Sequence, residues 1–489
     1  MNGKKLLCAL LAGTMMLSFA GCKKDTEVAE GDVPTLIYLV PGDPQKDEVT
    51  VETALNEILV EKIGAKVDLQ FIDWNAWKEK TNLMMATQEY FDIASGYQMS
   101  ISELVSNGSI YDMTDLLEET PKLKEELPEY LWEAASVDGR VYCVPNQQIE
   151  ASNTGIAVRK DLAEKYNFDV SKVETIMDLE PFWQAVRDNE QGIYPFKMSS
   201  ASIFVKDALG DKYEPQPQSS GYGTTLIKID HETFKVSATP DFYGLKEGAK
   251  LATECGEKGY FRADRATASD DSADMAAGKY ASFTSWYKPG EEAEIKNRTG
   301  YDYITKLITK PVISEGTPLS TKTIMSAYTN YPEKSMKFIE LLNTDKEVFN
   351  LISFGVEDKH YTWADEEHIQ LNTESGYCPN SSWVFGNVFN AYPMVGQEAT
   401  VWEDTKALND SADVSPLMGI TFDTTDIQVE LAQCTKVQSL YLVAMIDRAI
   451  GNPDEYWEDY RKELEKAGID KVIECYQKQV DEFIANKKN

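Results

Sequence analysis

The sequence predicts an α/β fold with a largely parallel sheet, because segments of strand character alternate with segments of helical periodicity. Residues 35–40 form an apolar run typical of a buried strand, and residues 65–71 alternate between apolar and polar side chains. Between them, apolar side chains recur at helical spacing from Val51 to Ile63, and Gly64 stands where a helix end is expected. This order is typical of βαβ units, in which helices cover the faces of a parallel sheet.

Later segments continue the pattern. A helix is expected at residues 74–87, and Pro332 fits the first turn of a helix through Leu342, after which Thr344 or Asp345 could cap the next helix. Further strands are expected at residues 91–94, 141–145, 154–158, 279–286 and 319–327, and two amphipathic helices at 453–467 and 470–485, separated by Gly468.

The length allows more than one core. The chain has 489 residues, of which 42% are hydrophobic and 11% aromatic. A single hydrophobic core rarely grows to this size, so we expect two or three domains.

The N-terminus has the layout of a cleavable secretion segment. Lys4 and Lys5 precede an apolar run of about 14 residues, which is shorter than the roughly 20 that span a bilayer. Residues 17–22 resemble a bacterial lipobox that ends on Cys22, with Phe19 where Leu is usual. We expect a signal peptide at 1–21, a lipid on Cys22 and a flexible linker at 22–33. An ordinary signal peptide with an incidental cysteine is the alternative.

The charge is strongly negative. The sequence has 81 Asp and Glu against 48 Lys and Arg, a formal net charge of −33. This excess repels nucleic acid and anionic lipid and argues against polyanionic ligands, so we expect no nucleic-acid partner.

The residues that usually carry catalysis are sparse or lack the required context. Five cysteines remain after Cys8 leaves with the signal and Cys22 is acylated, and their wide spacing indicates neither a disulfide framework nor a zinc site, although one disulfide stays open: Cys143, Cys255, Cys378, Cys434 and Cys475. The three histidines lie in no catalytic motif, and no phosphate-binding glycine loop occurs. We therefore expect no catalytic residue, no metal and no cofactor.

Candidate ligand contacts lie in the loops that follow the predicted strands, because ligands of such sheets bind beyond the carboxyl ends of strands. Carboxylates, amides and aromatic rings in these loops suit a sugar, which offers apolar CH faces and many hydroxyls. They are Asp43, Trp74, Tyr97, Gln98, Gln147 and Gln148. Asp43 could equally cap its turn, and Trp74 could equally pack the start of its helix.

Several motifs in order resemble the family-1 extracellular solute-binding proteins, which are receptors of carbohydrate ABC importers. They are Asp138-Gly-Arg-Val-Tyr142 with Pro145, Val158-Arg-Lys-Asp-Leu162 with Tyr166, Met275 with residues 278–283, and Pro332-Glu-Lys334. Residues 344–348, His360-Tyr361, 385–387, 419–423, 466–471 and 477–479 are similar to a lipoprotein subfamily with an added C-terminal module of unassigned function.

The resemblance implies a two-lobe periplasmic-binding-protein-like fold of type II, in which hinge crossings join two sheets flanked by helices. Lobe 1 would comprise residues 34–155 plus about 319–354, lobe 2 residues 156–318 plus about 355–418, and the C-terminal module residues 419–489. An oligosaccharide would bind between the lobes. The protein would be a monomer held on the extracellular or periplasmic side of the membrane, where it delivers its ligand to an ABC permease.

The resemblance also points to aromatic residues in the second half of the chain. Trp286, with Tyr287 beside it, and Trp383 stand where family members commonly place stacking rings, and Tyr361 and Trp363 are expected to flank a lobe 2 loop. Each could instead be a core or rim residue. A peptide ligand, or a surface enzyme or accessory that processes polysaccharide, remains an alternative function.

Overall fold

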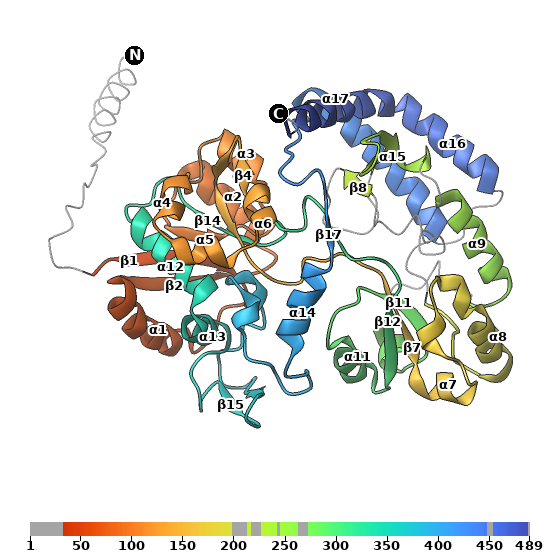
Figure 1. Cartoon of the computed structure of the whole chain (residues 1–489), viewed down its shortest axis with the longest axis horizontal. Helices are drawn as coiled ribbons and strands as arrows, with labels where there is room; N and C mark the ends of the chain where they lie inside the picture. The colour runs from red at the N-terminus through yellow and green to blue at the C-terminus, as the bar shows by residue number, and fades with distance from the viewer. Residues whose placement is uncertain are drawn as a thin grey trace, which may run out of the picture.

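The computed structural model describes residues 33–197, 213–216, 226–241, 245–262, 272–446 and 453–487. These residues form two α/β lobes and a C-terminal module, arranged as Figure 1 shows. The predicted signal peptide, Cys22 and the linker up to residue 32 lie outside the described residues. Among the helices of the described ranges, none has the length and apolar character needed to cross a membrane.

Lobe 1 contains a five-stranded sheet in the order β2-β1-β3-β14-β6. The strands are β1 (Thr35–Pro41), β2 (Lys66–Ile72), β3 (Ile93–Ser95), β14 (Lys322–Met325) and β6 (Cys143–Pro145). β1 pairs in parallel with β2 and β3, while β14 is antiparallel to β3 and β6. The carboxyl ends of β1, β2, β3 and β6 therefore meet at one edge, which we call the carboxyl edge.

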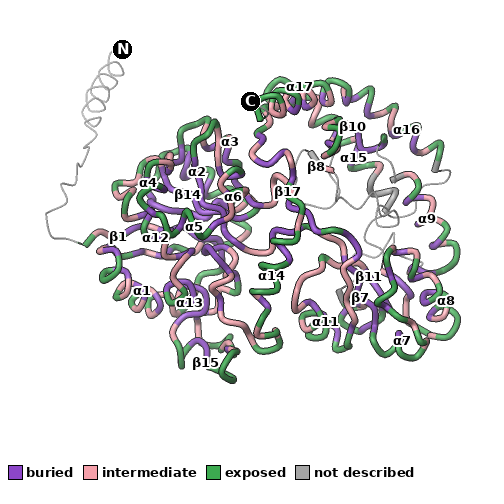
Figure 2. The backbone as a smooth tube through the Cα atoms, viewed as in Figure 1, coloured by how far each residue is buried: buried purple, intermediate pink, exposed green. Residues whose placement is uncertain are grey.

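Helices cover this sheet, whose strands are buried as Figure 2 shows. They are α1 (Glu48–Ile63), α2 (Trp77–Thr87), α3 (Ile101–Ser106), α4 (Thr114–Glu118), α5 (Pro121–Glu126), α6 (Glu129–Ala134), α12 (Pro332–Thr344) and α13 (Lys346–Phe354), with the hairpin β4 (Ser136–Val137) and β5 (Arg140–Val141) after α6. α1 buries Val51, Leu55, Leu59 and Ile63 against the sheet and ends at Gly64 in the left-handed conformation, as its spacing predicts. Asp345 caps α13 by accepting from the backbone of Glu347 and Val348.

Residues 361–391 pack in the lobe 1 core, so their assignment to lobe 2, as part of residues 355–418, needs correction. Tyr361, Ile369, Val384, Phe385, Val388 and Ala391 are part of the lobe 1 core. Side chains of Asn387 and Asn390 donate to the carbonyl of Asn343 on α12, which docks this irregular stretch on the lobe. It contains β15 (Tyr361–Trp363), β16 (Ile369–Leu371), and the 3-10 helices η7 (Ser382–Val384) and η8 (Val388–Asn390).

Lobe 2 contains a three-stranded antiparallel sheet, in which β7 (Gly155–Arg159) lies between β11 (Ser282–Ser285) and β12 (Tyr303–Leu307). The prediction of parallel pairing is therefore correct for β1 to β3 and wrong for this sheet. The helices of this lobe are α7 (Lys160–Lys165), α8 (Glu180–Asn189), α9 (Leu245–Glu257), α10 (Ser272–Ala276) and α11 (Glu291–Thr299), with η1 (Val170–Lys172), η2 (Ile176–Leu179) and η5 (Thr239–Asp241).

The C-terminal module is a helical bundle on a small sheet. It contains α15 (Gln428–Ile446), α16 (Pro453–Lys466), α17 (Ile469–Lys487), η9 (Thr425–Ile427) and the strands β8 (Tyr213–Gln216), β9 (Ile227–Asp230) and β10 (Val236–Ala238). The two predicted helices on either side of Gly468 are confirmed. The module packs on lobe 2, since Trp457 is part of the lobe 2 core and its Nε1 donates to the carbonyl of Pro240 at 2.6 Å.

Three crossing segments join the lobes, and they bond to one another. Ser152 of the first crossing exchanges backbone hydrogen bonds of 2.7 and 2.9 Å with Val312 of the second. Val312 lies in β13 (Val312–Ile313), which pairs in parallel with β17 (Asp413–Val414) of the third crossing. α14 (Val401–Asp410), which precedes β17, lies between the lobes in Figure 1. We call this strip of three crossings the hinge.

A buried carboxyl group ties the hinge together. Glu150 is 2% exposed and accepts from Tyr130 of α6 at 2.5 Å and from Asn409 of α14 at 3.4 Å. Asn409 Oδ1 in turn accepts from the backbone amides of Glu150 and Ala151 at 3.0 and 3.1 Å. Burial, opposed by the hydrogen bonds and aided by the nearby charge of Asp410, raises the pKa of Glu150 to about 7.

The five cysteines of the described chain are free, so no disulfide joins Cys143, Cys255, Cys378, Cys434 and Cys475. Cys143, Cys255 and Cys434 are buried, as expected of small apolar core residues.

We expect Glu150→Gln to remove a pH dependence of stability. The folded carboxyl keeps its proton up to about pH 7, whereas the unfolded one loses it near pH 4.5, so the unfolding free energy falls as pH rises through this window. The full shift corresponds to about 3 kcal/mol. Urea unfolding at pH 5 and pH 8 should show the variant gaining stability over the wild type at the higher pH. The same gain for the exposed control Glu129→Gln, or no pH-dependent difference, would contradict this.

We expect Gly386→Ala to destabilise lobe 1 strongly. Gly386 has φ +149°, and an added Cβ would lie 2.6 Å from the backbone carbonyl oxygen of Leu342 on α12. Because the clash involves the backbone of both segments, it cannot be relieved by moving a side chain. We expect the unfolding free energy measured in urea to fall by about 2–4 kcal/mol. The control Gly139→Ala also has positive φ, but no atom lies within 4 Å of its added Cβ, and about 1 kcal/mol should be lost. Equal losses would argue against the docking of this segment on α12.

Candidate ligand-binding site

Three aromatic side chains meet at the carboxyl edge of lobe 1. Trp74 follows β2, Tyr97 follows β3, and Trp383 lies in η7. The rings of Trp74 and Trp383 are stacked, with centroids 5.6 Å apart and 27° between the planes. The Tyr97 ring meets both edge-on, at 5.8 Å from Trp74 and 5.3 Å from Trp383. We call these three residues the aromatic cluster.

Hydrogen bonds to the backbone hold the cluster in place. Trp77 Nε1 donates to the Tyr97 carbonyl at 2.8 Å, which fixes the loop after β3. Asn146 Nδ2 donates to the Trp383 carbonyl at 3.1 Å, and Asn146 Oδ1 accepts from the Thr323 hydroxyl at the same distance. Asn146 is 1% exposed. It therefore works as a positioning residue that joins η7, β14 and the start of the first crossing.

The cluster presents flat apolar surface at the edge where the chain leaves lobe 1. All three side chains are half-buried and pack against the lobe 1 core. Flat aromatic faces suit the CH faces of sugar rings, and several hydrogen-bonding groups nearby would set orientation. The arrangement can therefore bind a carbohydrate by stacking.

Trp286 lies on the other side of the hinge. It directly follows β11 of lobe 2, is 55% exposed, and donates from Nε1 to the carbonyl of Ala151 at 3.0 Å. Tyr287 is half-buried beside it, and its carbonyl accepts from Asn153 Nδ2 at 2.9 Å. Burial and then the carboxylates of Glu292, Glu291 and Asp404 raise the pKa of Tyr287, so its phenol stays a hydrogen-bond donor.

The first crossing connects the two aromatic regions. Asn146 holds Trp383 of lobe 1, and Ala151 holds Trp286 of lobe 2. Five residues of extended chain span at most about 18 Å, so both tryptophans border the same short segment. No ring contact joins Trp286 to the aromatic cluster among the described residues. One elongated ligand could touch both.

The other predicted site residues near the carboxyl edge differ in their surroundings. The Asp43 and Gln98 side chains are exposed, and Gln98 has φ +60°. Gln148 Nε2 donates to the Thr321 hydroxyl at 2.6 Å and thus joins two crossings. Gln147 is 3% exposed, and its Nε2 points to the carbonyl of Glu126 at 3.5 Å, so the structure buries it inside lobe 1 instead of at the edge.

Tyr361 and Trp363 lie apart from the aromatic cluster. They form a second group with Tyr392, in which the Trp363 and Tyr392 rings are 4.8 Å apart. This group sits on lobe 1, where Trp363 and Tyr392 line a cavity of about 240 Å³ together with Trp402 and Phe389. Their predicted location in a lobe 2 loop is therefore wrong, because the β15–β16 hairpin packs on the lobe 1 core.

Sequence reasoning missed Asn146. It stands directly before the two glutamines that were chosen, at the first position after β6. Because Asn146 is buried at the end of β6, its side chain can bond both Trp383 and Thr323. No local sequence pattern distinguishes it from Gln147 and Gln148, which also carry side-chain amides.

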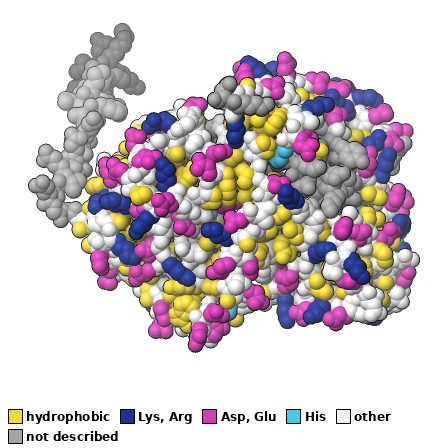
Figure 3. All heavy atoms as spheres, viewed as in Figure 1, with side chains coloured by type: hydrophobic (Ala, Val, Ile, Leu, Met, Phe, Trp, Pro, Cys, Tyr) yellow, Lys and Arg dark blue, Asp and Glu magenta, His cyan; other side chains and the backbone are white. Residues whose placement is uncertain are grey.

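The surface charge is mixed. Figure 3 shows acidic and basic side chains interspersed over the visible face, with hydrophobic side chains gathered near its middle. In the described residues, no group of three or more His, Cys, Asp or Glu side chains has the arrangement of a metal site.

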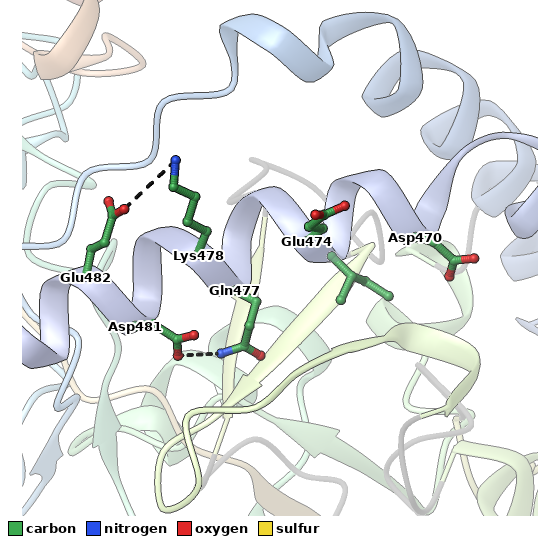
Figure 4. Close-up of a pocket in the computed structure, with 7 residues that line it drawn as sticks. Asp470, Glu474, Gln477, Lys478, Asp481 and Glu482 are labelled. Carbon is green, nitrogen blue, oxygen red and sulfur yellow. Dashed lines mark hydrogen bonds and ion pairs between the residues drawn. The ribbon is translucent and has the colours of Figure 1, made fainter.

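A groove of about 550 Å³ along α17 has a different chemistry from the aromatic cluster. It is lined mainly by charged and amide side chains, with Lys478 paired to Glu482 at 3.9 Å and Gln477 Nε2 donating to Asp481 at 2.9 Å (Figure 4). Gln477 also bonds the backbone of Phe234 and Val236. No aromatic side chain of the described residues lines this groove, and Gln477 ties it to the small sheet, so we assign it to module packing.

The family model for bacterial extracellular solute-binding proteins matches residues 54–353, and a domain of unknown function, DUF3502, matches residues 416–485. A carbohydrate ABC transporter substrate-binding protein of Streptococcus pneumoniae serotype 4 is 26% identical over 466 residues, which cover 94% of this chain and 92% of the relative.

Solved structures share the fold. The N-glycan transport solute binding protein of Streptococcus pneumoniae has a TM-score of 0.80 at 24% identity, covering 93% of this chain and 100% of that one. An extracellular solute-binding protein of Bifidobacterium longum subsp. infantis has a TM-score of 0.65 at 17% identity, covering 92% and 98%. With its two lobes, its hinge and more than half of its length matched, the chain belongs to the family of bacterial extracellular solute-binding proteins.

Proposed function

We propose that this protein captures an oligosaccharide between its lobes and delivers it to the permease of an ABC transporter. The observation that carries the proposal is the aromatic cluster at the carboxyl edge, with Trp286 across the same crossing. Stacking surfaces on both sides of a hinge suit a ligand with several sugar rings. The relatives support this: the N-glycan transport protein is described in complex with Man1GlcNAc and with Man5GlcNAc.

Binding would be coupled to closure of the lobes. A ligand favours the closed state only when it contacts both lobes, because only then does its affinity differ between open and closed forms. The aromatic cluster would provide the lobe 1 contact, with Asp43 and Gln98 as exposed polar groups nearby. Trp286 and Tyr287 would provide the lobe 2 contact. The protein would act as a monomer.

A lipid on Cys22 would hold the protein on the outer side of the membrane. Residues 22–33 would form the tether between the lipid and β1, and a short tether raises the local concentration of the protein at its permease. The lipobox-like segment 17–22 motivates this part of the proposal.

We expect Trp74→Leu and Trp383→Leu each to weaken oligosaccharide binding about tenfold or more, because leucine keeps apolar volume but lacks a flat face. Isothermal titration calorimetry against a panel of oligosaccharides that includes Man5GlcNAc would measure this. Trp132→Leu is the matched control, since Trp132 is half-buried on α6 of the same lobe and bonds the carbonyl of Lys124 outside the cluster. Trp363→Leu should also bind normally. If the folded wild-type protein binds no oligosaccharide of the panel, the proposed function is wrong.

We expect Cys22→Ala to release the protein from the membrane. Without the thiol no lipid can be attached, and the apolar run alone is too short to span a bilayer. Phase partition of bacterial extracts in Triton X-114 should find the wild type in the detergent phase and the variant in the aqueous phase. Cys8→Ala serves as control, because Cys8 lies within the predicted signal peptide. Both variants partitioning like the wild type would contradict the anchor.

A further inference from the structure

Lys322 is a buried cation of lobe 1. It is the first residue of β14, it pairs with Pro145 of β6, and it is 3% exposed. Its side chain lies against Gly96, where an added Cβ would come within 2.7 Å of Lys322 Cγ. The backbone of the two residues is also bonded, from the Gly96 amide to the Lys322 carbonyl at 2.6 Å. The lysine side chain is thus fixed one residue before Tyr97 of the aromatic cluster.

Among the described residues, no carboxylate pairs with the ammonium group of Lys322. Its Nζ donates to the carbonyl of Leu319 at 2.8 Å, and the described residues form no ion pair with it. The titratable group next to Lys322 is the thiol of Cys143. Burial raises the pKa of this thiol to about 12, so the thiol is neutral. Burial lowers the pKa of Lys322 to about 8. A cation held in this way costs folding free energy that a ligand could recover.

The lysine lines a cavity that lobe 1 shares with the C-terminal module. The cavity has a volume of about 340 Å³, within the roughly 300–1,000 Å³ typical of ligand pockets. Met99 and Ser100 of lobe 1 form one wall, two residues beyond Tyr97, and Thr421 and Phe422 of the module form the other. The wall from lobe 1 therefore lies two residues along the chain from the aromatic cluster. Hydroxyl side chains and two aromatic rings, those of Phe422 and Tyr476, line the cavity together with Lys322, as a sugar would need.

We propose that this cavity is a subsite for an acidic sugar residue, whose carboxylate binds Lys322 Nζ while Phe422 and the hydroxyl side chains of the C-terminal module contact its ring. The proposal rests on the proposed function. It gives the C-terminal module a role in ligand recognition, because the module supplies the wall that faces Lys322. It also names a ligand class, oligosaccharides that carry a single uronic or sialic acid at the position reaching this cavity.

The surrounding charges favour one carboxylate over many. Glu315 lines the same cavity and lies near Tyr476. Burial, and then the charge of Glu315, raise the pKa of Tyr476. The chain as a whole carries −33 charges, which repel a polyanion. A single carboxylate that enters the cavity meets the Lys322 ammonium at short range, where water is excluded and the attraction is strongest.

Calorimetry with matched pairs of neutral and acidic oligosaccharides tests the subsite, with N-acetyllactosamine and its sialylated form as the first pair. A charged hydrogen bond in a buried site is expected to make the acidic member bind about 10- to 100-fold more tightly. Lys322→Met should remove this preference, because methionine keeps the apolar stem without the charge. The exposed control Lys122→Gln should keep it.

A measurement on the wild type alone guards against a variant that fails to fold. Because a carboxylate binds the protonated amine, the preference for acidic sugars should fall about tenfold from pH 7 to pH 9, as Lys322 loses its proton in the free protein. Phe422→Ala should weaken binding of the acidic members more than that of the neutral ones.

The outcomes separate the two proposals. If oligosaccharides bind but the acidic members gain nothing, or if Lys322→Met keeps the preference, the acidic subsite is overturned while the proposed function stands. If no oligosaccharide of either kind binds to the folded protein, the proposed function fails and the subsite falls with it. A preference that disappears in Lys322→Met and at pH 9 supports the subsite.

Discussion

The backbone hydrogen bonds of the hinge are the constraint on which the rest of the molecule depends. Ser152, Val312 and Asp413 belong to three crossings whose backbones are hydrogen-bonded to one another, which satisfies polar groups along the strip. The lobes can then rotate about this strip while its ladder stays intact, as in other hinge closures. Asn409 extends the strip, since it clasps the first crossing from the end of α14.

Much of the fold follows from local patterns in the sequence. An apolar run, a segment of helical periodicity and an alternating segment predict the unit β1–α1–β2. Asp345 caps the start of α13, as its residue type predicts. The placement of residues 361–391 could not be predicted in the same way. This stretch has little regular structure, and it docks through Asn387 and Asn390 on the carbonyl of Asn343, about 45 residues back in the chain.

The candidate site was predictable in part. Trp74 and Tyr97 follow from the rule that ligands lie beyond strand ends, whereas Trp383 was expected only from a family resemblance. Its meeting with the other two depends on the bond from Asn146, which is 237 residues away. Periodicity reports which face of an element is buried, and it cannot report a contact over such a separation. The burial of Lys322 could not be predicted for a related reason, since a lysine at the start of a strand is ordinarily exposed to solvent.

The C-terminal module changes what opening the two lobes would cost. It packs on lobe 2, yet its Met418 joins Ala134 of lobe 1 and Ile313 of the hinge in a small apolar cluster. At the other end of the module, Lys487 pairs with Glu133 of lobe 1 at 3.3 Å. Rotation of the lobes away from each other must separate these groups and expose the apolar cluster to water. The module would therefore resist opening of the lobes, and such resistance would change the residence time of a ligand more than its rate of capture.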